Sequence, residues 1–503
     1  MKSIDQLLWE NAAKYGEEAY LYEKVGDFYR AQSYAGFYRD VLRFARVLRK
    51  KGLEGKKIGI YSENSCLSMA ADLAVLGYTG ISVALSEYWD GKQLLEICGS
   101  LELDAILYAP GREDSLRLLR ERFPSLCLLS LYELQRESMR LPEWKYAAAV
   151  RRSFSGAKYE YAGLYNNTFP PGRWASQSEN GCVKIVFSSG STGEPKAVML
   201  SLRNIFANQE NTFQRAPIRH TDRAYLFLPL SHTFGEIGNF LYSLISGMKI
   251  ALSSRKDRIL SELAELHPTV LCAVPLVLER IYRISEETGK SISALLGGNI
   301  RFLFSGGAAL RTEIRAAIKS ERINLIEAYG LTETASIISL EYSYQSHDIS
   351  SSGTVLENQS VRIAKPDSDG IGEICVKGDN VFIGYYGRED YYRSCFDRDG
   401  YFHTGDLGFL RGGKLYLKGR KTRMILRSNG QNVYPEELEQ CLRQALSLDR
   451  AELSEEGGHI HARLYSGELP EDGLLERVND ILPKYAQIES VELLRKQDPR
   501  QWK

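Results

Sequence analysis

Short apolar runs alternate with helical patterns along most of the chain. In the first third, strands are predicted at Lys57–Tyr61, Ile81–Leu85, Ala105–Tyr108 and Leu126–Leu131, with a helix at Ser65–Tyr78. Such alternation is typical of a parallel sheet with crossover helices. The same pattern returns in six later apolar runs: Val183–Phe187, Ala224–Leu228, Ile250–Ser253, Thr269–Val274, Arg301–Phe304 and Leu325–Ala328. The sequence therefore predicts a large α/β body.

The pattern changes near residue 353. From Gly353 to Gly419, short strands of period two are separated by turns that contain glycine, which predicts a small antiparallel, barrel-like β unit. Mixed helix and strand follow, so we expect an N-terminal domain at 1–419 and a small α/β C-terminal domain at 420–503. Residues 141–180 are rich in Tyr, Pro, Gly and Asn and are expected to form a long surface excursion.

Composition narrows the class of protein. A chain of 503 residues predicts two or more folding units. Lys plus Arg equals Asp plus Glu, at 64 each, so no long-range attraction to nucleic acid or anionic lipid is expected. The eight cysteines form no C-x-x-C pair, which favours a reducing cytoplasm. The N-terminus has no apolar signal core, and the most apolar run, 69–85, is interrupted by Asp72, so no integral membrane segment is expected.

The strongest local motif is Val183–Lys196, a buried strand that runs into a loop of glycine and hydroxyl residues closed by a lysine. Such a loop can direct backbone N–H groups and hydroxyls onto phosphate oxygens, and the lysine adds a positive charge. It lacks the G-K-[ST] ending of a Walker loop. A plain Ser/Gly-rich surface turn is the alternative. The candidate phosphate-binding residues are Ser188, Ser189, Gly190, Ser191, Thr192, Gly193 and Lys196.

Two further motifs follow strands. In Glu327–Thr334, a strand ends in Tyr-Gly, and Thr332 and Glu333 come where ligands bind in an open parallel sheet. A carboxylate beside a triphosphate requires a divalent cation between them, although a helix cap and a first-turn acid would explain the same residues. In Tyr401–Gly408, Asp406 lies in a Gly turn that suits a ribose diol, unless it is an ordinary turn aspartate.

These segments, with Lys418–Glu439, resemble the adenylate-forming (AMP-binding) superfamily of acyl-CoA synthetases, luciferases and peptide-synthetase adenylation domains. The similarity includes Leu228–His232, Phe304–Ala309 and Gly372–Gly378. The pairing of Leu-Pro-Leu-Ser-His with Ser-Asn-Gly-Gln-Asn-Val-Tyr-Pro-Glu-Glu is most similar to long-chain fatty acyl-CoA synthetases. The resemblance implies a large body of several subdomains and a small mobile C-terminal domain.

The resemblance also implies roles for individual residues. The loop that ends at Lys196 would hold the β- and γ-phosphates of ATP, while Thr192 and Glu333 would place Mg²⁺. His232 would stand near the acyl carboxylate. The nucleoside would be bound by Gly306, Gly307, Ala308, Tyr329, Gly330 and Thr332 around the adenine and by Asp406 and Arg420 at the ribose.

The resemblance also bears on the C-terminal part of the chain. Gly430 would border the thiol channel, and the hinge would lie near Arg420–Thr422, with Thr422 where the family usually has Asp or Lys. The family's late Gly-Lys motif is not recognisable, and Lys503, the last residue, falls close to the place of its catalytic lysine. This C-terminal domain is shorter than the family norm.

The implied function is activation of a carboxylic acid, a medium- or long-chain fatty acid, to an acyl-adenylate with transfer to coenzyme A. An alternative is an acyl-AMP ligase that loads the phosphopantetheine of an acyl carrier protein, which shares the first half-reaction. A third alternative is a degenerate homologue that binds nucleotide but catalyses no reaction. Amino-acid adenylation is disfavoured because Phe234 is followed by Gly235 rather than Asp, although Glu236 comes next. The apolar run Phe234–Leu244 suits either an acyl tunnel or plain core.

Overall fold

The computed structural model describes residues 2–141, 181–189, 195–342, 351–426, 432–456, 459–467 and 469–495. The expected excursion at 142–180 lies outside these ranges. The body of the molecule contains a thirteen-stranded sheet and a seven-stranded sheet, each flanked by helices. Within the described ranges, no helix is both long enough and apolar enough to cross a bilayer.

The seven-stranded sheet carries the phosphate-loop hairpin. Its order is β18-β8-β7-β4-β3-β5-β6. Its strands are β3 (Lys57–Tyr61), β4 (Ile81–Leu85), β5 (Ala105–Tyr108), β6 (Cys127–Ser130), β7 (Lys184–Ser189), β8 (Pro195–Leu200) and β18 (Gly384–Tyr385). The predicted bounds of β3, β4 and β5 are confirmed. Strand β8 was not predicted; it pairs antiparallel with β7, so that Ser188 lies opposite Lys196.

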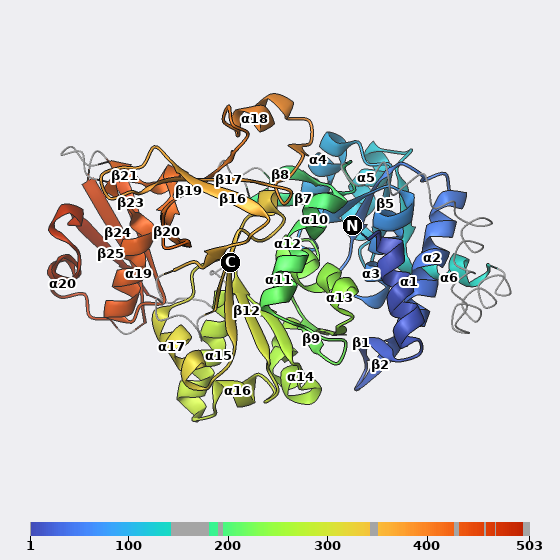
Figure 1. Cartoon of the computed structure of the whole chain (residues 1–503), viewed down its shortest axis with the longest axis horizontal. Helices are drawn as coiled ribbons and strands as arrows, with labels where there is room; N and C mark the ends of the chain where they lie inside the picture. The colour runs from blue at the N-terminus through green and yellow to red at the C-terminus, as the bar shows by residue number, and fades with distance from the viewer. Residues whose placement is uncertain are drawn as a thin grey trace.

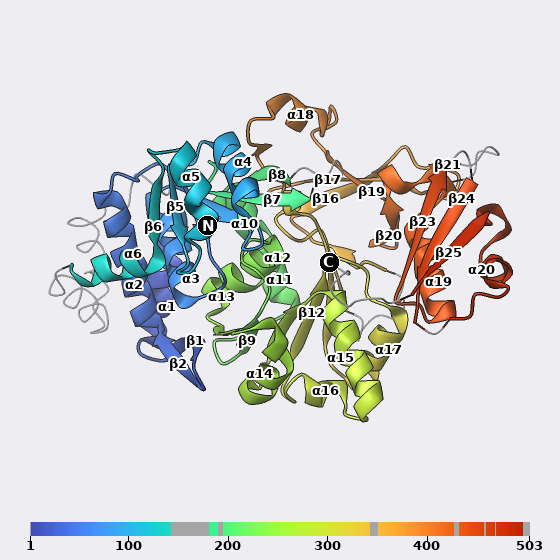
Figure 2. The ribbon, with the colours of Figure 1, turned by 180° about the vertical axis from the view of Figure 1, so that it is seen from behind.

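Helices of the first third cover this sheet and its neighbour. They are α1 (Ile4–Tyr15), α2 (Tyr34–Lys50), α3 (Cys66–Ala74), α4 (Gly91–Leu101), α5 (Arg117–Arg122) and α6 (Leu131–Met139). The predicted helix at Ser65–Tyr78 is α3 followed by a π-helical turn, Val75–Thr79, and its N-cap is the Ser65 side chain. Figure 2 shows these helices gathered at the N-terminal end of the molecule.

The thirteen-stranded sheet has a parallel centre. Its parallel strands are β9 (Arg223–Leu226), β10 (Lys249–Leu252), β11 (Val270–Ala273), β12 (Phe302–Gly306) and β13 (Leu325–Tyr329). Helices α14 (Ile259–Leu266), α15 (Pro275–Thr288), α16 (Ile292–Leu295) and α17 (Thr312–Ser320) connect and cover them. One edge is the hairpin of β1 (Ala19–Val25) and β2 (Phe28–Ser33). The carboxyl ends of β12 and β13 face the site described below.

At its other edge the sheet continues into the antiparallel segment predicted from the glycine turns. Its strands are β14 (Ser339–Tyr342), β15 (Thr354–Val355), β16 (Gln359–Ala364), β17 (Gly372–Gly378), β19 (Phe402–Arg411) and β20 (Lys414–Arg420). β14 pairs with β13 and β15, so these strands extend the main sheet by hydrogen bonding. The short helix α18 (Glu389–Ser394) projects above them (Figure 1).

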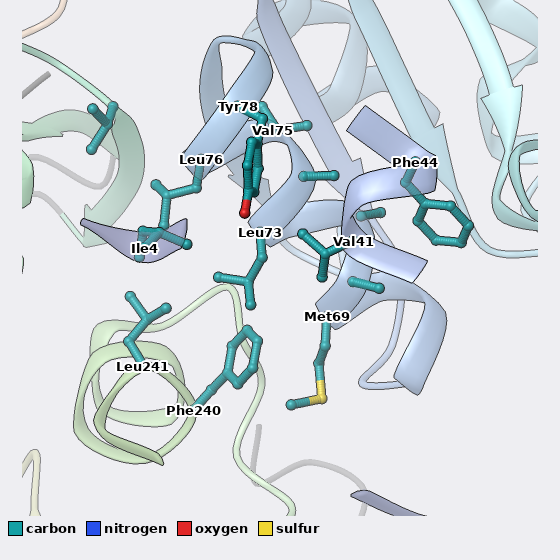
Figure 3. Packing of buried hydrophobic residues seen from close by; sticks show 14 of the residues in the cluster. Ile4, Val41, Phe44, Met69, Leu73, Val75, Leu76, Tyr78, Phe240 and Leu241 are labelled. Carbon is teal, nitrogen blue, oxygen red and sulfur yellow. The ribbon is translucent and has the colours of Figure 1, made fainter. Parts of the chain in front are cut away.

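Apolar side chains from distant segments form the main core. Figure 3 shows Ile4 of α1, Leu73 of α3 and Phe240 packed together, with Leu241 beside Ile4. Phe240 and Leu241 belong to a π-helix, Glu236–Leu241, and both are 0% exposed. Most of the apolar run 234–244 is therefore core rather than the wall of a tunnel.

The C-terminal residues build a small unit with a core of its own. Its elements are β21 (Ile425–Leu426), β22 (Asn432–Val433), α19 (Pro435–Leu446), β23 (Arg450–Glu456), β24 (His459–Tyr465), α20 (Leu474–Ile481) and β25 (Ser490–Leu494). Leu442, Leu453, Ile460 and Val478 are among the buried residues of this separate cluster. In both views the unit lies at the end of the molecule opposite helices α1 and α2.

Candidate active site

The β7–β8 hairpin brings the ends of the predicted phosphate loop together. The Ser188 hydroxyl donates a hydrogen bond to Glu333 Oε1 at 2.8 Å, which joins the first motif to the second. Gly190, Ser191, Thr192 and Gly193 lie outside the described residues, as does the side chain of Ser189. Ser188, at the described start of the loop, therefore lies beside the Glu333 carboxylate.

Glu333 comes from a short 3₁₀ turn, Thr332–Thr334, directly after β13. Its side chain is buried, and Oε1 also accepts a hydrogen bond from the Tyr385 hydroxyl at 2.9 Å. Ala335 and Ser336 follow with φ of 46° and 84°, a left-handed conformation that costs energy for residues other than glycine. Backbone strain directly after an acidic residue that lines a cavity is typical of a functional turn.

Gly330 is required by a close approach of backbone. A Cβ at this position would lie 2.2 Å from the carbonyl oxygen of Ser336, which no side chain could tolerate. The absence of a side chain lets the strained turn fold back against the end of β13. The Tyr-Gly pair of the motif thus fixes where Thr332 and Glu333 emerge.

Lys196 faces the same cavity as Glu333. Its ammonium group donates to the Tyr391 hydroxyl at 2.7 Å and lies 4.6 Å from the centroid of that ring. It is also 5.7 Å from the ring of Tyr385. Sequence reasoning gave neither tyrosine a role, although Gly384–Tyr386 is part of the family resemblance, because α18 and β18 lie almost 200 residues beyond the lysine.

The predicted ribose ligands meet around Asp406. Arg420 Nε lies 2.9 Å from Asp406 Oδ1, and the Tyr329 hydroxyl donates to Oδ2 at 2.7 Å. Burial raises the pKa of Asp406, while Arg420 and Tyr329 oppose that rise. Burial also raises the pKa of Tyr329 well above its usual value, so this phenol stays a hydrogen-bond donor. Each carboxylate oxygen has a second lone pair with which to accept a ribose hydroxyl.

Two connected cavities lie over these groups. One of about 1200 Å³ is lined by Ser188, Lys196, His232, Thr332 and Glu333. Another of about 1260 Å³ is lined by residues predicted to bind the nucleoside, namely Gly307, Ala308, Tyr329, Gly330, Asp406 and Arg420. Gly307 and Gly330 line both cavities, whereas Gly306 lines only the first. The candidate phosphate-binding residues therefore lie at the first cavity, and the candidate ribose-binding residue Asp406 lies at the second.

The residues present fit a nucleoside triphosphate with Mg²⁺. No cluster of three or more acidic, His or Cys side chains that could hold a metal occurs in the part of the chain that the structure describes. Mg²⁺ usually binds one or two carboxylates and takes its other oxygens from water and substrate phosphates. The hydrogen bonds that Ser188 and Tyr385 donate to Glu333 both fall on Oε1, so Oε2 is the oxygen suited to a cation.

His232 stands at the first cavity on a loop that Asn64 holds in place. The Asn64 amide donates to the Leu228 carbonyl at 2.8 Å and accepts from the Leu230 N–H at 3.1 Å. Desolvation in the cavity lowers the pKa of His232, and Glu87 partly opposes this. The imidazole is therefore neutral at neutral pH. Asn64 was not singled out from sequence, because a lone Asn after a strand reads as a turn residue.

Glu236 does not face the cavities. It is 1% exposed, and its Oε1 lies 2.5 Å from Lys184 Nζ, so it is engaged in the core. Position 235 could not carry an Asp either, because a Cβ there would lie 2.5 Å from the Pro229 carbonyl oxygen. The site therefore lacks the carboxylate that an amino-acid substrate's ammonium group would need at this position.

The predicted hinge is a 3₁₀ turn, Lys421–Arg423, that contains Thr422. Lys421 Nζ lies 2.7 Å from Glu373 Oε2, which His403 also contacts at 2.9 Å. Burial favours the neutral form of Glu373, but Lys421 and His403 hold its pKa below the usual value. Gly430 and Lys503 lie outside the described residues.

A small cavity beside the first one extends toward the core. It has a volume of about 20 Å³. Its lining includes Phe234, Ile237, Tyr242, Phe304 and Ile337 together with the polar Asn208, Gln209 and Thr212. Of the run 234–244, Phe234, Ile237 and Tyr242 line this cavity.

Several known proteins are similar to this chain. A long-chain-fatty-acid–CoA ligase of Xenopus laevis is 24% identical over 89% of this chain and 66% of its own length. A rat long-chain-fatty-acid–CoA ligase matches 54% of this chain and 45% of its own length, so the chain spans less than two thirds of these relatives. A 2-succinylbenzoate–CoA ligase of Bacillus cereus is 30% identical over 65% of this chain and 69% of its own length.

Solved structures share the fold. An O-succinylbenzoate coenzyme A synthetase from Bacillus subtilis, in complex with ATP and magnesium ion, matches 97% of this chain and 95% of its own, with a TM-score of 0.79 at 22% identity. A fatty acyl CoA synthetase from Mycobacterium tuberculosis gives a TM-score of 0.72 at 20% identity over 98% of this chain and 94% of its own. The predicted α/β fold is thereby confirmed.

The family model of AMP-binding enzymes matches residues 8–386, which include the phosphate loop, the Glu333 turn and Tyr385. The match covers well over half of the chain. The chain belongs to the AMP-binding enzyme family.

Proposed function

We propose that the protein is an acid–thiol ligase that uses ATP and Mg²⁺ to convert a carboxylic acid into an acyl-adenylate, releases pyrophosphate, and passes the acyl group to coenzyme A. One observation carries the proposal. Lys196, Glu333 and His232 line a cavity of about 1200 Å³ that joins the cavity lined by Tyr329, Asp406 and Arg420. A polyphosphate, a carboxylate and a nucleoside can therefore meet at one place.

The residues around the polyphosphate would neutralise its negative charge. Ser188 and the loop 189–193 would donate to the β- and γ-phosphates, and Lys196 would add a positive charge beside them. Glu333, with Thr192, would hold Mg²⁺, which supplies Lewis-acid stabilisation of the phosphate charge when bound. These groups lower the repulsion between an anionic acid and the triphosphate, because their charges are fixed before the reaction.

The residues around the nucleoside would fix the position of ATP in the site. Gly306, Gly307, Ala308 and Gly330 would leave room for the adenine, with Tyr329 and Thr332 beside it. Asp406 and Arg420 would hold the ribose hydroxyls. Holding the α-phosphorus in line with the acid replaces a chance encounter by a fixed geometry.

The acid would lie at His232, whose neutral imidazole can donate one hydrogen bond to a carboxylate oxygen. Its chain would extend past Phe234, which lines both the first cavity and the small one. We propose a medium- or long-chain fatty acid, and the similarity to the Xenopus and rat long-chain-fatty-acid–CoA ligases supports this choice.

The thiol step would use residues 420–503 as a mobile domain, with the turn at Lys421–Arg423 as its hinge. Gly430 would border the thiol channel and Lys503 would serve the adenylation step. Coenzyme A is the proposed acceptor, and an acyl carrier protein is the alternative. All eight cysteines are free, which supports a cytoplasmic location.

Mass spectrometry tests the first half-reaction. The full chain is incubated with ATP, Mg²⁺ and a panel of fatty, aromatic and dicarboxylic acids. We expect an acyl-AMP and stoichiometric pyrophosphate with a fatty acid. ATP binding without adenylate from any acid would favour a non-catalytic nucleotide-binding protein. Adding coenzyme A or purified carrier protein to the same reaction identifies the thiol acceptor.

A further inference from the structure

Tyr391 has a contact that its position does not otherwise explain. It lies on α18, a helix of which no residue is buried, and its own side chain is 43% exposed. Its hydroxyl nevertheless accepts a hydrogen bond from Lys196 at 2.7 Å, with the ammonium 4.6 Å from the ring centroid. An exposed tyrosine in a surface helix contributes little to the core, so this contact is the main interaction that its ring and hydroxyl make together.

Tyr385 makes the complementary contact. Its hydroxyl donates to Glu333 Oε1 at 2.9 Å, and its ring lies 5.4 Å from the ring of Tyr391. Burial and the neighbouring Glu333 raise the pKa of Tyr385, so its hydroxyl keeps the proton that it donates. One tyrosine thus holds the cation of the cavity and its neighbour holds the anion.

This arrangement keeps two opposite charges apart. Among the described residues, no ion pair within 4 Å joins Lys196 to Glu333, although both line one cavity. A lysine side chain is flexible, and in a half-buried cavity its ammonium would otherwise gain energy by approaching the carboxylate. A phosphate ligand would then first have to break that pair. Cation–π attraction and the hydroxyl hold the ammonium without neutralising it.

We propose that Tyr391 is a positioning residue for Lys196, which it holds away from Glu333 and ready to bind the pyrophosphate portion of a nucleoside triphosphate. The inference deepens the proposed function and rests on it. The ligand class is a polyphosphate anion with Mg²⁺. Tyr391 acts through the lysine rather than by contacting the reacting atoms.

Calorimetric titration with Mg²⁺-pyrophosphate tests this role without turnover. Tyr391→Phe removes only the hydroxyl, and we expect about tenfold weaker binding, because a hydrogen bond to a charged group is lost. Tyr391→Ala also removes the ring and should weaken binding further. Tyr392→Phe is the matched control, since Tyr392 is the next residue of α18 but its hydroxyl reaches only the Phe382 carbonyl at 3.4 Å. We expect it to bind within about twofold of the wild type.

A double-mutant cycle shows whether Tyr391 works through Lys196. In a Lys196→Ala background, Tyr391→Phe should change pyrophosphate affinity by less than about twofold. Equal loss in both backgrounds, or no loss in the wild-type background, would overturn the proposal. Tyr391→Phe decides the matter if Tyr391→Ala fails to fold. A wild-type chain that binds neither pyrophosphate nor ATP would instead defeat the proposed function, so the two failures are distinguishable.

Discussion

Two lysines of the same hairpin, Lys184 and Lys196, each lie near a glutamate from another element, and the two arrangements are opposite. Lys184 on β7 is 3% exposed, and its Nζ lies 2.5 Å from Glu236 Oε1 and 2.7 Å from Asp72 Oδ1. Lys196 on β8 lines a cavity with Glu333, and a tyrosine holds each of the two charged groups. The first set is buried and its charged groups are ion-paired. The second set lines a cavity, and its lysine and glutamate are held apart.

The difference shows what each set is suited to. One lysine cannot neutralise two carboxylates, and burial raises the pKa of Glu236 well above its usual value, which favours the protonated form of Glu236. Burial opposes the charge of Lys184, but Asp72 and Glu236 outweigh it and raise the lysine's pKa. With Glu236 protonated, the buried cluster carries no net charge. In the cavity, the charges of Lys196 and Glu333 remain available to a ligand.

Removing the buried lysine should have the largest effect. Lys184→Met leaves the Asp72 carboxylate without its cation, and we expect the free energy of unfolding to fall by about 3–5 kcal/mol. Chemical denaturation measures it. Lys196→Met is the matched control from the same hairpin and should cost less than about 1 kcal/mol, because its side chain reaches the cavity. Equal losses for the two variants would mean that the comparison between sealed and open charges is wrong.

Removing the open charges should affect turnover rather than stability. Lys196→Ala or Glu333→Gln should slow pyrophosphate release by about 10²–10³-fold, since each removes one fixed charge from the phosphate end. A coupled pyrophosphate assay with the preferred acid measures the rate, and thermal melts of the same samples follow the fold. Unchanged turnover in both variants would exclude this cavity as the place of reaction.

The buried strands could be predicted from sequence almost to the residue. Lys57–Tyr61, Ile81–Leu85 and Ala105–Tyr108 were correct because strands buried on both faces read as continuous apolar runs between polar residues. β8 (Pro195–Leu200) was missed because it begins with Pro195 directly after the loop. The pairing of β14 with β15 joins the antiparallel segment to the main sheet. Local sequence patterns do not predict which strands pair with each other.

The site was predictable where motif residues lie at strand ends, and not where a distant side chain holds them. Ser188 and Glu333, 145 positions apart, do meet, and each lies at the carboxyl end of a strand, although the two strands belong to different sheets. The contact between Lys196 and Tyr391 spans 195 positions and comes from a surface helix. Side chains that position the reactive groups carry no motif, because any element that reaches the cavity can supply them.

The smallest effect concerns the proton on Glu236. An ordinary Glu loses its proton near pH 4.5, whereas the folded protein keeps it to higher pH. Above that pH the unfolded chain binds fewer protons than the folded one, so the free energy of unfolding falls as pH rises, by at most about 1.4 kcal/mol per pH unit. Glu236→Gln cannot titrate and mimics the protonated side chain. We expect it to remove this part of the slope.

Urea titrations of the wild type and Glu236→Gln between about pH 5 and 8 measure the difference, in which all other titrating groups cancel. The stability of the variant relative to the wild type should rise steadily with pH. A constant difference would show that Glu236 is ionised in the fold and that Lys184 faces two negative charges. The hairpin would then hold an anionic cluster, which would weaken polyphosphate binding. A neutral cluster leaves Lys196 as the dominant charge of the hairpin at the cavity, which is the arrangement that a polyphosphate site requires.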